Sequence, residues 1–282
     1  MTDHRGDQRA KVMRFVALHA APGAFVVPNP WDAGSARILT ALGFAALATT
    51  SAGLAFSLGR RDAEGAVSRE ETLANARAIV DATDLPVSAD LEDGFGPRPE
   101  DAAETIRRAA AIGLVGGSIE DATADPARPI HDFGRAVERV AAAVEAAREL
   151  PFPFTVTARA ENFLFSRPDL ADTIARLRAF EAAGADVLYA PRLPDMAAIR
   201  EVCAAVSRPV NVVMGLAGQN FTVAELAQAG VKRISLGSAL ARAALAGLVR
   251  AAREVRDHGS FGFADDALRF ADANGFMASR QG

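Results

Sequence analysis

The stretch LPVSADLEDGFGPRPEDAAETIRRAAAIGLVGGSIED, residues 85–121, contains one complete strand–helix–strand pattern. The apolar runs at residues 85–91 and 114–121 indicate short strands, and residues 100–113 between them have the apolar spacing of a helix. Gly113 directly precedes the second strand, which is the usual position of a glycine that ends a helix. This order predicts two parallel strands joined by a crossover helix.

The same pattern recurs along the chain. Eight apolar runs indicate strands, at residues 24–30, 45–51, 85–91, 114–121, 154–162, 185–191, 209–215 and 233–238. Helical spacing separates them, at residues 32–44, 69–83, 100–113, 134–150, 169–184, 195–207 and 222–230. Eight such units predict an α/β fold, a (β/α)8 TIM-type barrel, with a doubly wound open sheet as the competing fold. No linker divides the chain, so we predict one domain over residues 1–282, in which residues 240–282 form a C-terminal helical extension that packs between subunits.

Composition restricts the class of partner. The chain has 282 residues, of which 50% are hydrophobic, and its 31 basic and 35 acidic side chains give a net charge of −4 without a basic stripe. This excludes nucleic acid and an anionic membrane surface as predicted partners and favours small-molecule chemistry. Cys203 is the only cysteine, so an internal disulfide and a cysteine-ligated zinc site are excluded. With no secretory signal and no apolar run of about 18 residues, the expected location is the cytoplasm.

Carboxylates gather at the end of the predicted strand 85–91. Asp90, Glu92 and Asp93 lie within four positions, and Glu120 ends the next strand. Asp90 and Glu92 alternate along a strand end, so both are expected to point into the mouth of the barrel, where unpaired carboxylates are costly to desolvate. Asp90, Glu92 and Glu120, with no histidine or thiolate among them, offer the hard oxygen ligands that Mg²⁺ or Mn²⁺ prefers. We therefore predict a cation among these acids.

Other polar residues follow the predicted strands at the same end. They are Asn29, Trp31, Asp32, Thr49, Thr50, Ser51, Asp121, Arg159, Glu161, Asn162 and Asn211. Because the active site of a (β/α)8 barrel lies at the C-terminal ends of its strands, these side chains are expected to converge. Arg159 is predicted to bind an anionic substrate, with an ion pair to Glu161 as the structural alternative. Helix capping is the alternative for Asp32, Asp93 and Asp121.

Four local motifs, in order, resemble the isocitrate lyase and phosphoenolpyruvate mutase superfamily. DLEDGFG at residues 90–96 is similar to the family's Asp-x-Asp followed by Gly-aromatic-Gly, with Glu92 in place of the second aspartate. SLGRRD, which ends at Asp62, resembles its Gly-x-x-Asp, and the preceding TTS lies where the family binds a carboxylate. SIED at residues 118–121 and TARAENF at residues 157–163 match the fourth and fifth strands. The resemblance extends from about Phe25 to Ser238.

The resemblance implies a Mg²⁺ enzyme, with Mn²⁺ able to substitute, that holds a 2-oxo acid or its enolate. The implied metal ligands are Asp90, Glu92 and Glu120, with Asp62 in the outer shell. The implied substrate-binding residues are Trp31, Thr50, Ser51, Ala52, Arg159 and Asn211. Arg159 would neutralise charge on the oxygen that becomes an enolate. We also expect a homo-oligomer, either a dimer or a tetramer.

The loop between Ala122 and Phe133 departs from the family pattern. The lyase branch carries a cysteine acid here, whereas this loop contains neither cysteine nor lysine, and only Thr123 and Arg128 resemble the phosphonate branch. Pro191 also replaces a polar residue of the relatives. We expect the loop to act as a lid, and the proton donor to be water, His131 or Tyr189. C–C cleavage of a 2-oxo acid, with oxaloacetate decarboxylation as the best single candidate, is the predicted function. The alternatives are P–C hydrolysis or mutase chemistry on phosphonopyruvate, and a non-catalytic 2-oxo acid binder.

Overall fold

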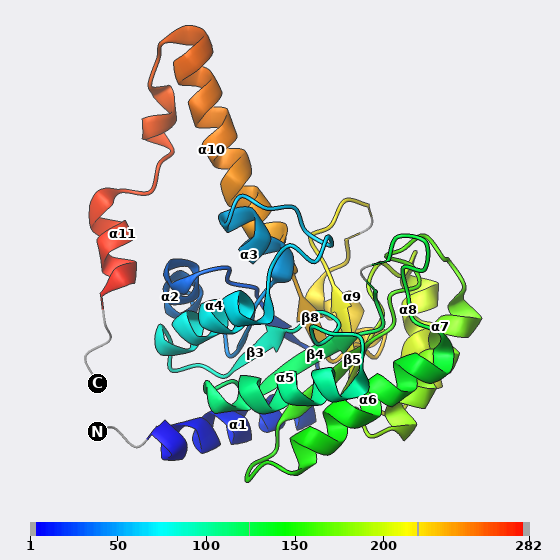
Figure 1. The fold of residues 1–282 in the computed structure, drawn as a ribbon. Coiled ribbons are helices and arrows are strands. Elements are labelled where there is room, and N and C mark those ends of the chain that lie inside the picture. Colours follow the sequence, from blue (N-terminus) through cyan, green and yellow to red (C-terminus); the bar gives the residue numbers. More distant parts are fainter. Residues whose placement is uncertain (1–3, 124, 219, 279–282) are drawn as a thin grey trace.

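The computed structural model describes residues 4–123, 125–218 and 220–278, and it has the predicted barrel (Figure 1). Eight parallel strands pair in the order β1-β8-β7-β6-β5-β4-β3-β2. The strands are β1 Phe25–Val27, β2 Leu47–Ala48, β3 Val87–Asp90, β4 Gly116–Glu120, β5 Thr155–Arg159, β6 Val187–Tyr189, β7 Val210–Val213 and β8 Arg233–Ser235. The amide of Ala48 donates to the carbonyl of Pro28 at 3.1 Å, which joins β2 to the end of β1 and brings the two edges of the sheet together. The (β/α)8 fold is therefore confirmed.

Helices surround this sheet (Figure 1). They are α1 His4–Ala20, α2 Ala33–Ala41, α3 Ser51–Ser57, α4 Arg69–Asp81, α5 Pro99–Ala111, α6 Phe133–Arg148, α7 Leu170–Ala182, α8 Met196–Ala205, α9 Val223–Gln228, α10 Ala239–His258 and α11 Phe270–Met277, with a 3-10 turn η1 Gly262–Asp265. Helix α1 buries Val12 and Phe15 against Ala46 and Val115, each of which directly precedes a strand. This helix therefore covers the N-terminal ends of the strands and leaves their C-terminal ends open.

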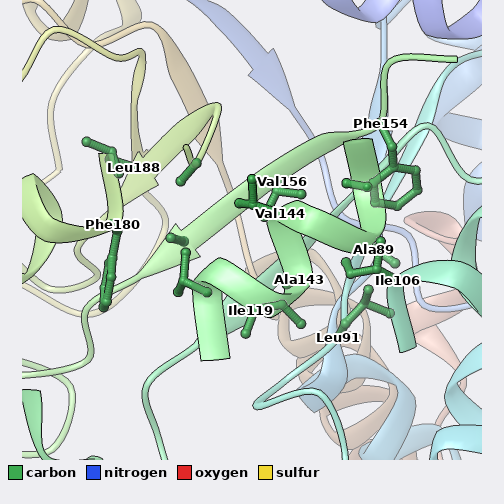
Figure 2. Close-up of a cluster of buried hydrophobic side chains, with 14 of the residues drawn as sticks. Ala89, Leu91, Ile106, Ile119, Ala143, Val144, Phe154, Val156, Phe180 and Leu188 are labelled. Atoms are coloured by element: carbon green, nitrogen blue, oxygen red, sulfur yellow. The ribbon is translucent and has the colours of Figure 1, made fainter. Parts of the chain in front are cut away.

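Apolar side chains fill the space between strands and helices. Figure 2 shows this core where α5, α6 and α7 pack on β3 to β6. Ile106 of α5, Ala143 of α6, Ile119 of β4 and Val156 of β5 belong to one cluster, and all four side chains are buried. Many core positions of α5 and α6 are alanines, which have small side chains and let the helices approach closely. The rigid core holds the strand ends, and thus the site, in place.

The C-terminal segment leaves the barrel. Helix α10 extends away from it, and α11 returns beside α2 (Figure 1), where Arg37 donates to the carbonyl of Met277 at 2.7 Å. Large apolar side chains remain exposed on this segment, such as Leu248 at 64% and Phe270 at 84%. Exposed apolar groups in such number are typical of an interaction surface. Charged residues interrupt α10, and within the described residues no helix is long and apolar enough to cross a membrane.

Candidate active site

Arg159 occupies the centre of the acidic cluster. It ends β5, and its Nη1 lies 3.0 Å from Asp90 Oδ1 and 3.1 Å from Glu120 Oε2. Its Nε lies 2.7 Å from Glu161 Oε1, and its guanidinium carbon lies 5.0 Å from the centre of the Tyr189 ring. The three carboxylates and the aromatic face hold the planar guanidinium in one orientation. A positive group does lie among the acids, and in this structure it is the guanidinium of Arg159.

The cluster contains more negative charge than Arg159 can neutralise. Burial, followed by repulsion from Asp90 and Asp62, raises the pKa of Glu92 to about 8. Burial and then the charge of Asp90 also raise the pKa of Asp62, and burial raises that of Glu120 well above its usual range. Carboxylates that raise one another's pKa are poised to take up either protons or a cation.

Glu92 reaches the site by a route that the strand pattern did not predict. Strand β3 ends at Asp90, Leu91 turns into the core, and Glu92 adopts a left-handed backbone with φ 49°. The expected alternation of Asp90 and Glu92 along an extended strand was therefore wrong, although both carboxylates lie in the cluster. A left-handed conformation is rare and costly for a residue with a Cβ, and it persists only where the surroundings impose it.

Two arginines hold the loop that follows Glu92. Arg139 of α6 is buried and donates to the carbonyls of Asp93 and Arg98, while Arg69 of α4 donates to the carbonyls of Gly94 and Phe95. Gly94 has a left-handed φ of 91°, and a Cβ there would lie 2.8 Å from Ala102. The glycine of this motif thus serves close packing, and the arginines satisfy carbonyls that no strand can pair.

The predicted carboxylate-binding residues begin α3, directly after β2. Thr50 caps this helix by accepting from the amide of Gly53 at 3.3 Å. The hydroxyl and amide of Ser51 donate to Asp90 Oδ2 at 2.9 and 3.2 Å, and Ala52 follows in the first turn. Ser51 thereby links the second strand to the acidic cluster.

Trp31 belongs to the same corner of the barrel. It lies after β1, and its carbonyl accepts from Asn75 at 2.9 Å. A Cβ added at Gly53 would lie only 2.9 Å from the Trp31 Cβ, so the two loops are in close contact. Substrate binding by Trp31, Thr50, Ser51 and Ala52 stays a prediction.

Among the described residues, neither Asn211 nor His131 hydrogen-bonds to Arg159 or to its three carboxylates. Asn211 is buried, with its amide oxygen accepting from Arg233 at 2.9 Å and its amide nitrogen donating to Ser235 at 3.0 Å. His131 is half-buried before α6, and its pKa is lowered by burial and then by the charge of Arg139. Their predicted roles in substrate binding and proton donation stay predictions.

The three aspartates with a capping alternative behave differently. Asp32 caps α2, accepting from the amide of Ser35 at 2.7 Å, so its capping role is confirmed. Asp93 accepts from the amide of Phe95 at 2.8 Å within the loop after β3. Asp121 caps none of the helices in the described structure. Its carboxylate accepts from the amide of Glu161 at 2.8 Å and from Arg176 at 2.9 Å, so it ties together the ends of β4 and β5.

Arg176, which the sequence analysis did not identify, anchors the predicted lid. Besides Asp121, it donates from Nη1 to the carbonyl of His131 at 2.9 Å and from Nε to Asp172 at 2.8 Å. The sequence signal that could have identified it is an arginine between the apolar Ile174 and Leu177 of a predicted helix. Beyond its base the loop folds back on itself, with Ala122 bridged to Ile130. The base of the loop is thus fixed by buried contacts.

The side chains predicted to bind a metal have suitable oxygen donors, but in this structure they are not arranged as a metal cage. No three histidine, cysteine or acidic side chains converge as a ready metal cage within residues 4–123, 125–218 and 220–278. Mg²⁺ usually keeps several waters and binds through only one or two carboxylates. Oxygen donors with excess negative charge therefore fit a hydrated Mg²⁺ and do not fit a closed zinc site.

The arginine and its carboxylates lie at the C-terminal ends of the strands, where (β/α)8 enzymes have their active sites. Residues 15–256 match the family model described as phosphoenolpyruvate phosphomutase, so the chain belongs to the phosphoenolpyruvate mutase and isocitrate lyase superfamily. Relatives of the chain include a 2-methylisocitrate lyase, a 2,3-dimethylmalate lyase and an oxaloacetate acetylhydrolase.

Individual relatives cover most of the chain. A Burkholderia cenocepacia crystal structure, assigned provisionally to a lyase or mutase, is 56% identical with a TM-score of 0.95, covering 97% of this chain and 98% of that one. The structure of oxaloacetate acetylhydrolase with its product oxalate is 25% identical with a TM-score of 0.85, covering 96% and 94%. The 2-methylisocitrate lyase of Shewanella oneidensis is 32% identical over 201 residues, 68% of this chain and 67% of the lyase.

Proposed function

We propose that this protein is a Mg²⁺-dependent enzyme that cleaves a C–C bond of a small 2-oxo carboxylate through an enolate, with oxaloacetate decarboxylation as the specific reaction. The observation that supports it most is Arg159, fixed by Asp90, Glu120 and Glu161 at the open end of the barrel. A guanidinium held in advance stabilises negative charge without reorganising when that charge develops.

The proposed reaction needs no cysteine as a proton donor. The bond between C3 and C4 of oxaloacetate breaks, C4 leaves as CO₂, and the electron pair moves to the C2 oxygen to form the enolate of pyruvate. Arg159 would stabilise the charge on that oxygen. Water then protonates C3, which suits a loop in which residues 122–133 include no cysteine.

A bound Mg²⁺ would polarise the 2-oxo group, and Mn²⁺ would substitute for it. Asp90, Glu92 and Glu120 would hold the ion directly or through waters, with Asp62 in the outer shell. The support is electrostatic, because burial and mutual repulsion raise the pKa of Glu92 to about 8, and a cation would relieve that repulsion.

The substrate carboxylate would bind at Thr50, Ser51 and Ala52. The Ser51 hydroxyl now donates to Asp90, so it already points to the cluster that the 2-oxo group would approach. Trp31, in contact with the same turn, would form a wall of the pocket.

P–C bond cleavage of phosphonopyruvate is the second candidate. The match of residues 15–256 to the phosphoenolpyruvate phosphomutase model favours it, and the same enolate would form there. The two reactions differ in the group released, which is CO₂ in one and phosphate in the other.

The test is a substrate screen with Mg²⁺-loaded and EDTA-treated protein. Oxaloacetate, other 2-oxo and 2-hydroxy di- and tricarboxylates and phosphonopyruvate are supplied, and pyruvate, CO₂, oxalate and phosphate are measured. We expect pyruvate and CO₂ from oxaloacetate, loss of turnover in EDTA, and a folded barrel in both cases. Glu120→Gln should lower turnover steeply, whereas Glu149→Gln, an exposed control that pairs with Arg107, should not.

Four outcomes would contradict the proposal. Oxalate as the product would mean hydrolysis, phosphate would mean P–C cleavage, and full turnover in EDTA would exclude the metal. Trp31 is the only tryptophan, so a change in its fluorescence on adding oxaloacetate without turnover would identify a non-catalytic binder.

We propose further that the chain forms a dimer or tetramer through residues 240–282 and acts in the cytoplasm. The exposed Leu248 and Phe270 support the first part. Light scattering after gel filtration should give an oligomer for the wild type and a smaller species for Leu248→Asp. A monomeric wild type would contradict the proposal.

A further inference from the structure

Arg139 is a buried cation on the apolar face of α6. Its neighbours on that face, Ala136, Val140 and Ala143, belong to the hydrophobic core, and the Arg139 side chain is only 1% exposed. Burial lowers the pKa of its guanidinium. Its ion pair with Asp93 is long, since Nη2 and Oδ2 are 3.7 Å apart. An apolar side chain would fill the same space at a lower cost of desolvation, so the guanidinium requires a reason beyond packing.

The hydrogen bonds of Arg139 go to the loop between β3 and α5. Its Nη2 donates to the carbonyl of Asp93, and its Nη1 donates to the carbonyl of Arg98 at 3.1 Å. One planar fork therefore fixes both ends of residues 93–98. Arg135, one turn earlier in α6, donates to the carbonyl of Pro97 at 2.7 Å. Helix α6 thus holds this loop at three of its carbonyls.

Glu92 lies directly before this loop and is bonded to two acids of the cluster through its main chain. Its amide donates to Asp90 Oδ1 at 3.4 Å, and its carbonyl accepts from the amide of Glu120 at 3.0 Å. The left-handed φ of 49° at Glu92 is costly and persists only where the chain is held on both sides. Strand β3 holds the chain before Glu92, and the bond from Arg139 to the Asp93 carbonyl holds it after.

We propose that Arg139 is a positioning residue, which holds the main chain after Glu92 so that Glu92 stays beside Asp90 and Glu120. The consequence rests on the proposed function: Arg139 would set the affinity of the site for Mg²⁺ by acting through Glu92, without contact with the ion. Groups that orient metal ligands typically change metal affinity by about 10- to 100-fold when they are replaced.

The alternative is that Arg139 only ties α6 to the neighbouring part of the barrel. Its replacement would then lower stability, but any folded variant would bind metal as the wild type does. The affinity of the metal-free protein for Mn²⁺, measured by electron paramagnetic resonance without substrate, separates the two accounts. Hydrogen exchange at the amides of residues 93–98 reports on the loop itself.

The experiment compares Arg139→Lys, Glu92→Ala and the double variant with the wild type. Lysine keeps the charge of Arg139 but cannot reproduce the planar fork that joins the two carbonyls. We expect the Mn²⁺ dissociation constant to rise about tenfold in Arg139→Lys and the amides of the loop to exchange faster. In the Glu92→Ala background, Arg139→Lys should have little further effect, because the carboxylate on which it acts is gone.

Arg148→Lys is the matched control. Arg148 lies at the other end of α6 and also donates to a carbonyl, that of Gly184 at 2.9 Å. Its replacement should leave both Mn²⁺ affinity and exchange in the loop unchanged.

Wild-type Mn²⁺ affinity in folded Arg139→Lys would overturn the proposal, as would an equal loss of affinity with and without the Glu92 carboxylate. If Arg139→Lys does not fold, Arg69→Lys decides, since Arg69 holds the same loop from α4 and the proposal requires that loosening it weakens Mn²⁺ binding. A wild-type protein that binds no Mn²⁺ would refute the metal dependence of the proposed function. Unchanged exchange at residues 93–98 in Arg139→Lys would then still overturn the positioning role of Arg139.

Discussion

Replacement of Arg159 separates its structural role from its role in turnover. Arg159→Met removes the only guanidinium that contacts Asp90, Glu120 and Glu161 in the described structure. Arg159→Lys keeps a positive charge but not the planar fork, so it cannot satisfy all three carboxylates in the same geometry. The two variants therefore differ in charge and share the loss of shape.

The magnitudes follow from burial. The Glu161 side chain is fully buried and bonds Arg159 at 2.7 Å, so Arg159→Met leaves a buried carboxylate unpaired, which typically costs about 3–5 kcal/mol of unfolding free energy. Burial raises the pKa of Glu161 to about 7 even beside Arg159, so at pH 6 protonation should reduce this cost. Arg159→Lys should cost less stability, yet lose about 100-fold or more in turnover with a smaller change in KM.

Denaturant unfolding at pH 6 and pH 8 and steady-state kinetics with oxaloacetate measure these effects. Arg148→Met is the matched control, because its partly exposed pair with Asp186 should contribute about 1 kcal/mol or less. Wild-type kinetics in Arg159→Lys would refute the reasoning and make Arg159 a structural ion-pair partner. Equal destabilisation by Arg159→Met and Arg148→Met would show that the cluster carries no buried charge.

Three further predictions concern the surroundings of the cluster. The pKa of Glu92 is raised to about 8, so the metal-free protein should lose stability as pH rises from about 4.5 through about 8; Glu92→Gln should flatten this slope in thermal melts recorded in EDTA. Iodoacetamide should not inactivate the enzyme, because burial raises the pKa of the sole thiol, Cys203, to about 11; rapid inactivation prevented by a 2-oxo acid would reopen the lyase mechanism. His131→Ala should leave the pH profile of kcat unchanged if water is the proton donor, whereas loss of a limb would identify His131 as the acid.

The sequence predicted the barrel because strand and helix spacing repeat locally. All eight predicted strands contain an observed strand, and the seven predicted helical segments coincide with α2 and α4 to α9. Helix α1 was not predicted, because it places few apolar side chains against the barrel, namely Val12, Phe15 and the partly buried Leu18, and its amphipathic pattern is weak. Helix α3, with seven residues, is too short to show a period.

The residues around the site were predicted less completely, for a physical reason. Motif spacing identifies acids at strand ends, but it does not show which positive group lies among them. In the structure this group is the guanidinium of Arg159. The left-handed backbone of Glu92 depends on Arg139 and Arg69, which come from helices distant in sequence. Arg233 could not be identified from the local sequence, because its partners Asn211 and Thr157 come from two other strands.

The contacts of Arg159 are buried, whereas those of the loop after β4 are largely exposed. Arg159, which would stabilise an enolate, is held in place by its bond to the buried Glu161 and by the ring of Tyr189. In the described part of the loop after β4, Arg176 fixes the base through buried contacts, whereas contacts farther out, such as Arg128 with Asp125, are exposed. An exposed loop tolerates substitution more readily than a buried network of charges. Changes in this loop would therefore alter which group leaves and how the enolate is protonated, while enolate stabilisation remains.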